Sequence, residues 1–263
     1  MKLRIITAVI AIVLFFPIVF YGGWPFKALV YLIATIGLLE LLKMRMTTNY
    51  IIPFATTIFL LWGLLIPLTE HELSNMLSTT KAELTLIGVL LLLSYTVLVK
   101  NKFTFEDSGF LVLSAIYIGS GFYYFMNARE AGVEFIFYGI IVVLATDTGA
   151  YFFGRAFGKK KLWPQISPNK TIEGAIGGIL LACLIATIFH CFFPLPHSLP
   201  IIILVTVLAS VVGQIGDLVE SAFKRHYDVK DSGKILPGHG GILDRFDSWL
   251  FIFPLLHFIH FIS

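Results

Sequence analysis

Residues 221 to 248 concentrate charge in an otherwise apolar sequence. This segment reads SAFKRHYDVKDSGKILPGHGGILDRFDS and holds nine of the chain's 19 basic and 16 acidic residues. Asp217 and Glu220 precede it, while Asp244 and Asp247 lie near its end. Carboxylate oxygens favour hard cations such as Mg²⁺, and Lys and Arg side chains bind phosphate. Together they predict Mg²⁺-dependent chemistry on phosphate groups.

Helical spacing brings part of this set together. Asp217, Glu220 and Lys224 stand at steps of three and four, which share one face of a helix. Asp244 and Asp247 repeat the three-residue step. Two carboxylate pairs around one cavity repel each other unless a cation lies between them. We therefore expect a metal site formed by Asp217, Glu220, Asp244 and Asp247.

A further carboxylate lies inside an apolar helix. Asp147, in the run VLATDTGAYFFGRAFGKKK, costs about 2.5 to 3.5 kcal/mol to place at the centre of a membrane helix. It shares a helical face with Tyr151 and Arg155. One interpretation is a buried carboxyl group hydrogen-bonded to a neighbouring helix. The functional interpretation is a carboxylate that faces a polar cavity at the inner membrane face.

The loop that follows is basic and leads into the apolar run GAIGGILLA. We interpret Ser167, Pro168, Asn169 and Thr171 as helix-start residues, whose backbone N–H groups would bind an anion beside Lys170. The alternative is an ordinary cap in a positively charged inner loop. The residues expected to bind substrate are Asp147, Lys170, Ser221, Lys230, Lys234, His239 and Arg245.

The composition identifies the surroundings of these residues as a membrane. The chain is 57% hydrophobic and 13% charged, against about 25% charged in soluble domains. Its net charge is +3, but the basic residues lie between apolar runs rather than in a tail or stripe. We therefore expect an integral, multi-pass membrane protein that binds no nucleic acid polymer.

The apolar runs predict an all-α bundle of about nine transmembrane helices. All basic residues except Lys27, Lys81 and Arg129 fall on one side of these spans, which places the N-terminus and the active site inside and the C-terminus outside. The expected spans lie near residues 5 to 22, 26 to 42, 50 to 68, 83 to 99, 108 to 126, 133 to 153, 172 to 193, 199 to 221 and 244 to 262.

The chain divides by polarity near residues 100 to 108. We expect residues 1–105 to be structural helices, with a role in oligomerisation, and residues 106–263 to form the catalytic domain. Glu40 stands near Lys43 at the inner end of the second span, and an ion pair at the membrane interface is its simplest interpretation.

Several motifs resemble those of one enzyme family. The runs SAFKR from Ser221, KDSG from Lys230 and PGHGGILDRFD ending at Asp247 are similar to the signature of phosphatidate cytidylyltransferases, also called CDP-diacylglycerol synthases. Upstream, DTGAY from Asp147 and ISPNKTIEG also resemble that family. The similarity is specific over residues 145 to 250 and weak over residues 1 to 100.

The resemblance implies a reaction in phospholipid biosynthesis, in which CTP and phosphatidate give CDP-diacylglycerol and pyrophosphate. It implies a homodimer in the cytoplasmic membrane, with Mg²⁺ and a monovalent cation such as K⁺. Asp217 and Asp244 correspond to the metal carboxylates, supported by Glu220 and Asp247. The implied catalytic residues are Asp217, Asp244, Lys224, Arg225 and Asp247.

Two other functions fit parts of the pattern. A CTP-dependent kinase of a lipid alcohol such as polyprenol would also combine an inner basic loop with membrane carboxylates. An ion-coupled transporter also places Asp residues near glycines in broken helices. A transporter would need them near the middle of the membrane in repeated halves, whereas here they cluster at one face and no repeat is evident.

The predicted orientation can be tested by cysteine labelling from each side of the membrane. After Cys183 and Cys191 are replaced, a cysteine at position 165 should react only with reagent on the inner side. A cysteine at position 198 should react only from outside. Labelling of position 165 from outside alone would contradict both the orientation and an active site on the inner face.

Overall fold

The computed structural model describes residues 2–45, 50–66, 81–238 and 240–262, and these are largely helical. Its elements are α1 (Lys2–Tyr21), α2 (Gly23–Met44), α3 (Ile51–Leu65), α4 (Lys81–Leu98), α5 (Phe105–Ala131), α6 (Val133–Phe157), β1 (Lys161–Trp163), β2 (Ser167–Thr171), α7 (Ile172–Phe192), α8 (Leu199–His226), α9 (Leu243–Phe246) and α10 (Trp249–Phe258).

Six of the described helices are long and apolar enough to cross a membrane, namely α2, α4, α5, α6, α7 and α8. Three more apolar segments are shorter than a span: Val9–Tyr21, Ile51–Leu65 and Trp249–Phe258. Leucines exposed along α4, such as Leu86 and Leu90, suit a surface that faces lipid tails. The chain is therefore a multi-pass helical membrane protein.

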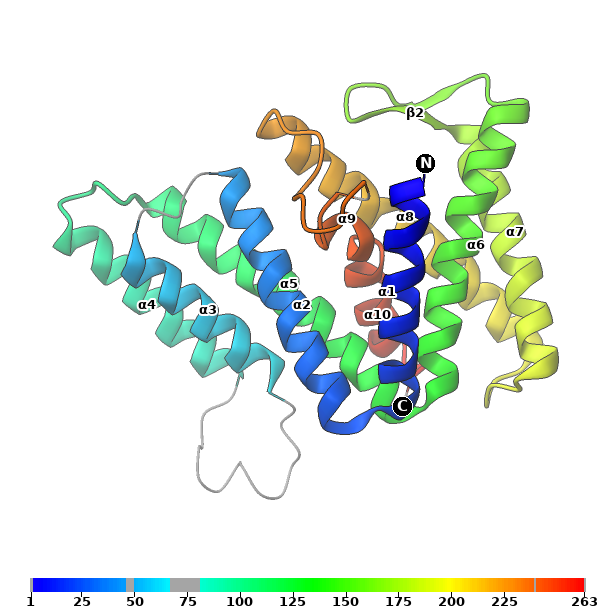
Figure 1. The fold of residues 1–263 in the computed structure, drawn as a ribbon, viewed down its shortest axis with the longest axis horizontal. Helices are drawn as coiled ribbons and strands as arrows, with labels where there is room; N and C mark the ends of the chain where they lie inside the picture. The colour runs from blue at the N-terminus through cyan, green and yellow to red at the C-terminus, as the bar shows by residue number, and fades with distance from the viewer. Residues whose placement is uncertain (1, 46–49, 67–80, 239, 263) are drawn as a thin grey trace.

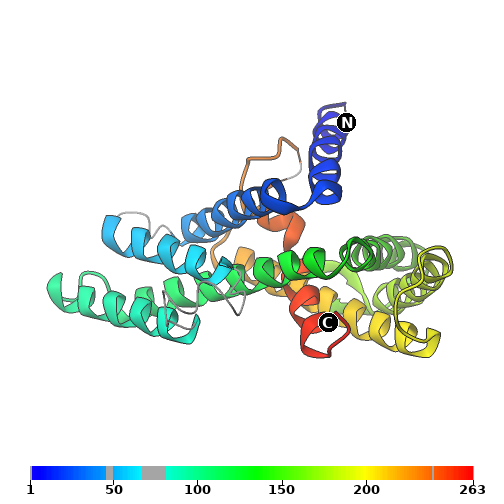
Figure 2. The same ribbon diagram turned by 90° about the horizontal axis from the view of Figure 1, so that it is seen from below.

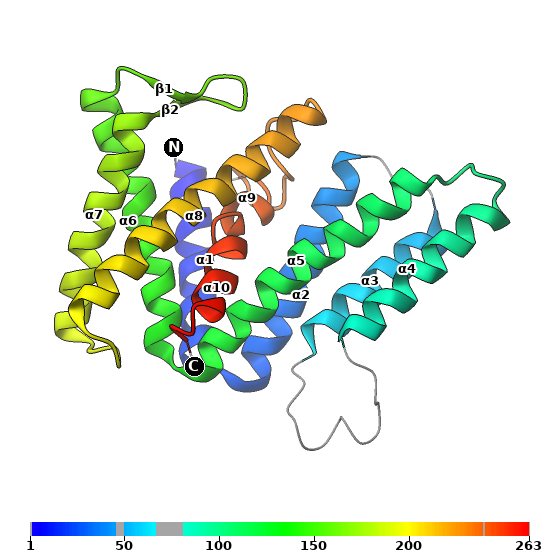
Figure 3. The ribbon, with the colours of Figure 1, turned by 180° about the vertical axis from the view of Figure 1, so that it is seen from behind.

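Helix α5 lies at the centre of the bundle and contacts α2, α3, α6 and α10. Helices α1 and α2 lie on one side of it and α8 on the other (Figure 2). The long helix α8 crosses α10 and contacts α7 (Figure 3). Thr104 and Asp107 form a capping box that fixes the start of α5.

Helices α6 and α7 pack against each other along their length because small residues line their contact. A Cβ atom added at Gly178 would lie 2.6 Å from the carbonyl oxygen of Thr146. One added at Gly174 would lie 2.7 Å from the carbonyl oxygen of Ala150. This close approach brings the end of α6, which carries Asp147, beside the segment that carries Lys170.

The basic loop between α6 and α7 differs from the expectation. Ser167 and Asn169 do not start a helix; they belong to β2, which pairs with β1 in an antiparallel hairpin. This hairpin lies over the ends of α6 and α7 (Figure 1). Thr171 does cap α7, since its hydroxyl accepts a hydrogen bond from the Gly174 N–H at 3.1 Å.

The last apolar run also differs from the expected continuous span over residues 244 to 262. It contains the single turn α9 and then α10, separated at Asp247 and Ser248. The Asp247 carboxylate accepts a hydrogen bond from the Ser248 backbone N–H at 2.6 Å. A side chain that competes in this way for backbone donors favours a helix end.

Candidate active site

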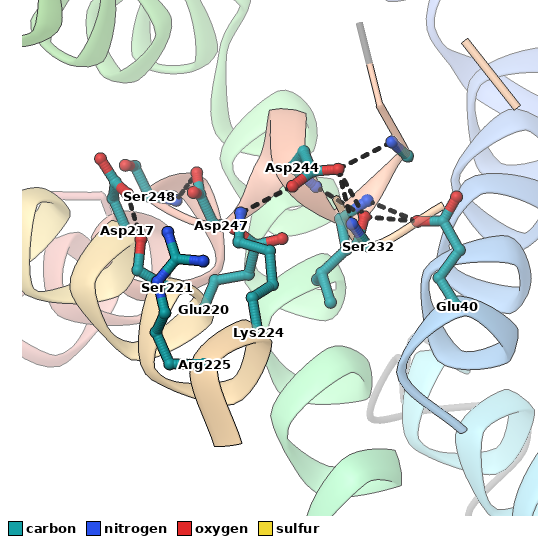
Figure 4. Close-up of polar contacts among 12 residues, drawn as sticks. Glu40, Asp217, Glu220, Ser221, Lys224, Arg225, Ser232, Asp244, Asp247 and Ser248 are labelled. Atoms are coloured by element: carbon teal, nitrogen blue, oxygen red, sulfur yellow. Dashed lines mark hydrogen bonds and ion pairs between the residues drawn. The ribbon is translucent and has the colours of Figure 1, made fainter. Parts of the chain in front are cut away.

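Lys224 is the charged centre of the site. Its ammonium group lies 2.5 Å from Glu220 Oε2, one turn earlier on α8, and 2.7 Å from Asp244 Oδ1 on α9 (Figure 4). Only 13% of the Lys224 side chain and 6% of the Asp244 side chain are exposed, and Glu220 is fully buried. The predicted helical face of Glu220 and Lys224 is confirmed. Asp244 contacts Lys224 from α9, which follows the loop after α8.

Backbone donors hold the second oxygen of Asp244. Oδ2 accepts hydrogen bonds from the Ser232 N–H at 2.9 Å, the Ser232 hydroxyl at 2.8 Å and the Gly241 N–H at 2.7 Å. Asp244 lies outside the six candidate spans. Burial raises the pKa of its carboxyl group, but the hydrogen bonds from Lys224 and Gly241 outweigh burial and lower the pKa to about 2. Asp244 is therefore ionised at neutral pH.

Asp217 lies at one end of the row of polar side chains in Figure 4, and Glu40 lies at the opposite end. The Asp217 carboxylate accepts a hydrogen bond from the Ser221 hydroxyl at 3.3 Å and pairs with the Lys170 ammonium group. Asp147 and Asp247 lie near enough for their carboxylates to repel that of Asp217. Carboxylates from α6, from α8 and from the break between α9 and α10 thus lie within electrostatic reach of one another.

A cavity of about 450 Å³ opens beside Asp217 and Lys170. This volume lies within the range of small-molecule sites. Asp147 lines the cavity together with the hairpin and α8, which agrees with the functional interpretation of this residue. The polar side chains of the lining are Asp147, Tyr151, Arg155, Asn169, Lys170, Thr171, Gln214 and Asp217.

The other predicted basic residues are more loosely placed. The Arg225 Nε donates a hydrogen bond to the Ile166 carbonyl at 3.2 Å and so links α8 to the hairpin. Arg245 is exposed, and its charge attracts the Asp147 carboxylate. Lys230 and Lys234 are exposed and belong to none of the ion pairs in the described part of the chain. His239 lies outside the described residues.

Glu40 is a member of this network that the sequence did not reveal. An ion pair with Lys43 was expected, but Glu40 is buried and its carboxylate accepts hydrogen bonds from the 232–243 region. A carboxylate that enters the bundle needs such donors because burial removes its hydration. The sequence did not reveal this role because Glu40 lies far from residues 232–243 in the sequence and close to Lys43.

The donor chemistry of the site fits Mg²⁺, although no group of three or more His, Cys, Asp or Glu residues within the described ranges is arranged around one metal position. The available donors are carboxylate oxygens, which a hard cation prefers. One of them, Glu220 Oε1, is buried without a hydrogen-bond partner in this structure. Lys170 and Lys224 neutralise Asp217 and Asp244 in the arrangement described here.

Comparison with known sequences defines the class of protein. The profile described as the cytidylyltransferase family matches residues 2–263. The chain therefore belongs to the cytidylyltransferase family. It is 51% identical to the phosphatidate cytidylyltransferase of Bacillus subtilis over 262 residues, which cover 98% of this chain and 97% of that protein. It is 47% identical to the phosphatidate cytidylyltransferase of Staphylococcus haemolyticus over 259 residues, 98% of each chain.

Proposed function

We propose that this chain transfers the cytidylyl group of CTP to phosphatidate, which yields CDP-diacylglycerol and pyrophosphate. The observation that carries the proposal is the match to phosphatidate cytidylyltransferases over almost the whole chain. The site supports it, because Lys170, Asp147 and Asp217 line a cavity in a membrane bundle, and Lys224 and Asp244 form a second ion pair on α8 and α9. A lipid substrate can reach such a site from the bilayer.

The lipid phosphate is the nucleophile in this proposal. It is already anionic, so it needs cations around it and no general base. One of its oxygens forms a bond to the α-phosphorus of CTP, and the bond from that phosphorus to the pyrophosphate oxygen breaks. The electron pair leaves with pyrophosphate. In this proposal Lys170 and Lys224, which neutralise carboxylates in the structure, bind phosphate oxygens during the reaction.

Asp217 and Asp244 would hold Mg²⁺, supported by Glu220 and Asp247. When bound, Mg²⁺ would neutralise the charge that develops on the triphosphate oxygens. We assign the binding of substrate phosphates to Lys224, Arg225 and the remaining basic residues of the site. The remaining residues with this assigned role are Lys170, Lys230, Lys234, His239 and Arg245.

We place the site at the cytoplasmic face of a bacterial inner membrane, in a homodimer whose chains cross the membrane about nine times. The excess of Lys and Arg on one side of the spans supports this orientation. A monovalent cation such as K⁺ is expected as a second ion.

Removing the metal carboxylates tests the assignment of the site. Asp217→Asn and Asp244→Asn keep the size of each side chain but remove a charge, so turnover should fall at least about 100-fold. Both proteins should still insert into the membrane. Cytidylyltransferase assays over a Mg²⁺ titration measure the effect, with Asp228→Asn on the exposed loop as the matched control. Full activity with unchanged Mg²⁺ dependence in both variants would refute the assignment.

The fate of labelled phosphate distinguishes the proposed reaction from a kinase. With CTP labelled at the α-phosphorus and phosphatidate as acceptor, the label should enter the lipid, and pyrophosphate should be released. A lipid-alcohol kinase would instead transfer the γ-phosphate and leave CDP in solution. Lipid labelled from γ-labelled CTP would therefore reject the proposed reaction.

A further inference from the structure

Glu40 connects the second helix to the loop that carries the site. It lies on α2 and is only 3% exposed. Its Oε1 accepts a hydrogen bond from the Ile242 N–H at 3.0 Å, and its Oε2 accepts one from the Leu243 N–H at 2.9 Å. The Ser232 hydroxyl lies 3.2 Å from Oε2 and is placed to donate a third. A single carboxylate thus accepts hydrogen bonds from Ser232, within the loop between α8 and α9, and from Ile242 and Leu243, where α9 begins.

The glycines of the loop make room for this carboxylate. A Cβ atom added at Gly233 would lie 2.3 Å from Glu40 Oε1, and one added at Gly241 would lie 2.4 Å from Glu40 Oε2. Gly240 has a φ of +82° and meets the Asp244 carboxylate in the same way, at 2.4 Å. Gly233 and Gly241 thus leave space for the Glu40 carboxylate, and Gly240 leaves space for that of Asp244.

Ser232 joins Glu40 to Asp244. Its hydroxyl lies 2.8 Å from Asp244 Oδ2 and 3.2 Å from Glu40 Oε2, and its one proton can go to either oxygen. Ser232 and Gly241 also donate their backbone N–H groups to Asp244. The loop therefore takes its shape from two buried carboxylates, one of which lies on a helix far away in the sequence (Figure 4).

We propose that Glu40 is a positioning residue for the reaction: by holding Ser232, Ile242 and Leu243, it orients Asp244 toward Lys224 and the proposed metal position. This inference rests on the proposed role of Asp244. A carboxylate is required because each of its two oxygens accepts a hydrogen bond from a backbone N–H, Oε1 from Ile242 and Oε2 from Leu243. In Glu40→Gln one oxygen becomes an NH₂ group, which would face an N–H donor and could not accept from it.

The test compares Glu40→Gln with Lys43→Gln, which removes the only basic partner that the sequence suggested for Glu40. Hydrogen exchange at the amides of Ile242 and Leu243 is measured in lipid nanodiscs without nucleotide or metal. We expect exchange at least about tenfold faster at one or both of these amides in Glu40→Gln and unchanged at both in Lys43→Gln, because only the first variant loses an acceptor oxygen.

Kinetics of the same proteins give the second readout. Loss of a residue that orients a metal ligand typically lowers metal affinity or activity by about 10- to 100-fold. Glu40→Gln should show a loss of this size and need more Mg²⁺ for half of its maximal rate, while Lys43→Gln matches the wild type. Ser232→Ala keeps the hydrogen bonds from the Ile242 and Leu243 N–H groups to Glu40, so it should give a smaller loss of activity in the same direction. This variant provides the test if Glu40→Gln does not fold.

Asp244→Asn, assayed in parallel, separates this inference from the proposed site. If Asp244→Asn is inactive while Glu40→Gln and Ser232→Ala retain wild-type exchange and Mg²⁺ dependence, Glu40 does not position the site. If Asp244→Asn is fully active, the assignment of Asp244 fails instead. Faster exchange spread evenly over α2 and α5 in Glu40→Gln would show a general structural role and would also overturn the inference.

Discussion

The site depends on one constraint: carboxylates buried in an apolar bundle must meet cations or N–H donors, because burial removes their hydration. Lys224 satisfies this constraint for two of them at once, Glu220 on its own helix and Asp244 on α9. The same ion pairs therefore join the C-terminal end of α8 to α9, at the start of the last apolar segment of the chain. Moving either carboxylate would leave a charge uncompensated.

The same constraint applies to further side chains, which are linked across the molecule by ion pairs and hydrogen bonds. From Lys224 these links pass through Asp244 and Ser232 to Glu40 on α2. At the other end, Lys170 neutralises Asp217 next to the cavity. In the proposed reaction Lys170 and Lys224 would exchange these carboxylates for phosphate oxygens of the substrates. Such an exchange suits phosphoryl chemistry, in which catalysis is mostly positioning and charge neutralisation.

Local spacing predicted the parts of the site that lie on one helix. The contacts of Glu220 with Lys224 and of Ser221 with Asp217 follow from the four-residue step of α8. The hairpin was missed because Ser, Pro, Asn and Thr suit both a helix start and a turn-rich strand. Glu40 was misinterpreted because its partners lie about 200 positions away, where no periodicity can reveal them. The pairing of Lys170 with Asp217 depends on the packing of α7 against α8 and is equally invisible in the sequence.

The most direct test of this account is the stability of a protein without the central lysine. Lys224→Met should lower the free energy of unfolding by about 3 to 5 kcal/mol, the typical cost of breaking a buried ion pair. Adding Glu220→Gln should recover part of that loss, because one uncompensated charge disappears, while Lys234→Met on the exposed loop should change little. Unfolding of the purified variants in mixed detergent micelles gives these values. Wild-type stability in Lys224→Met would contradict the account.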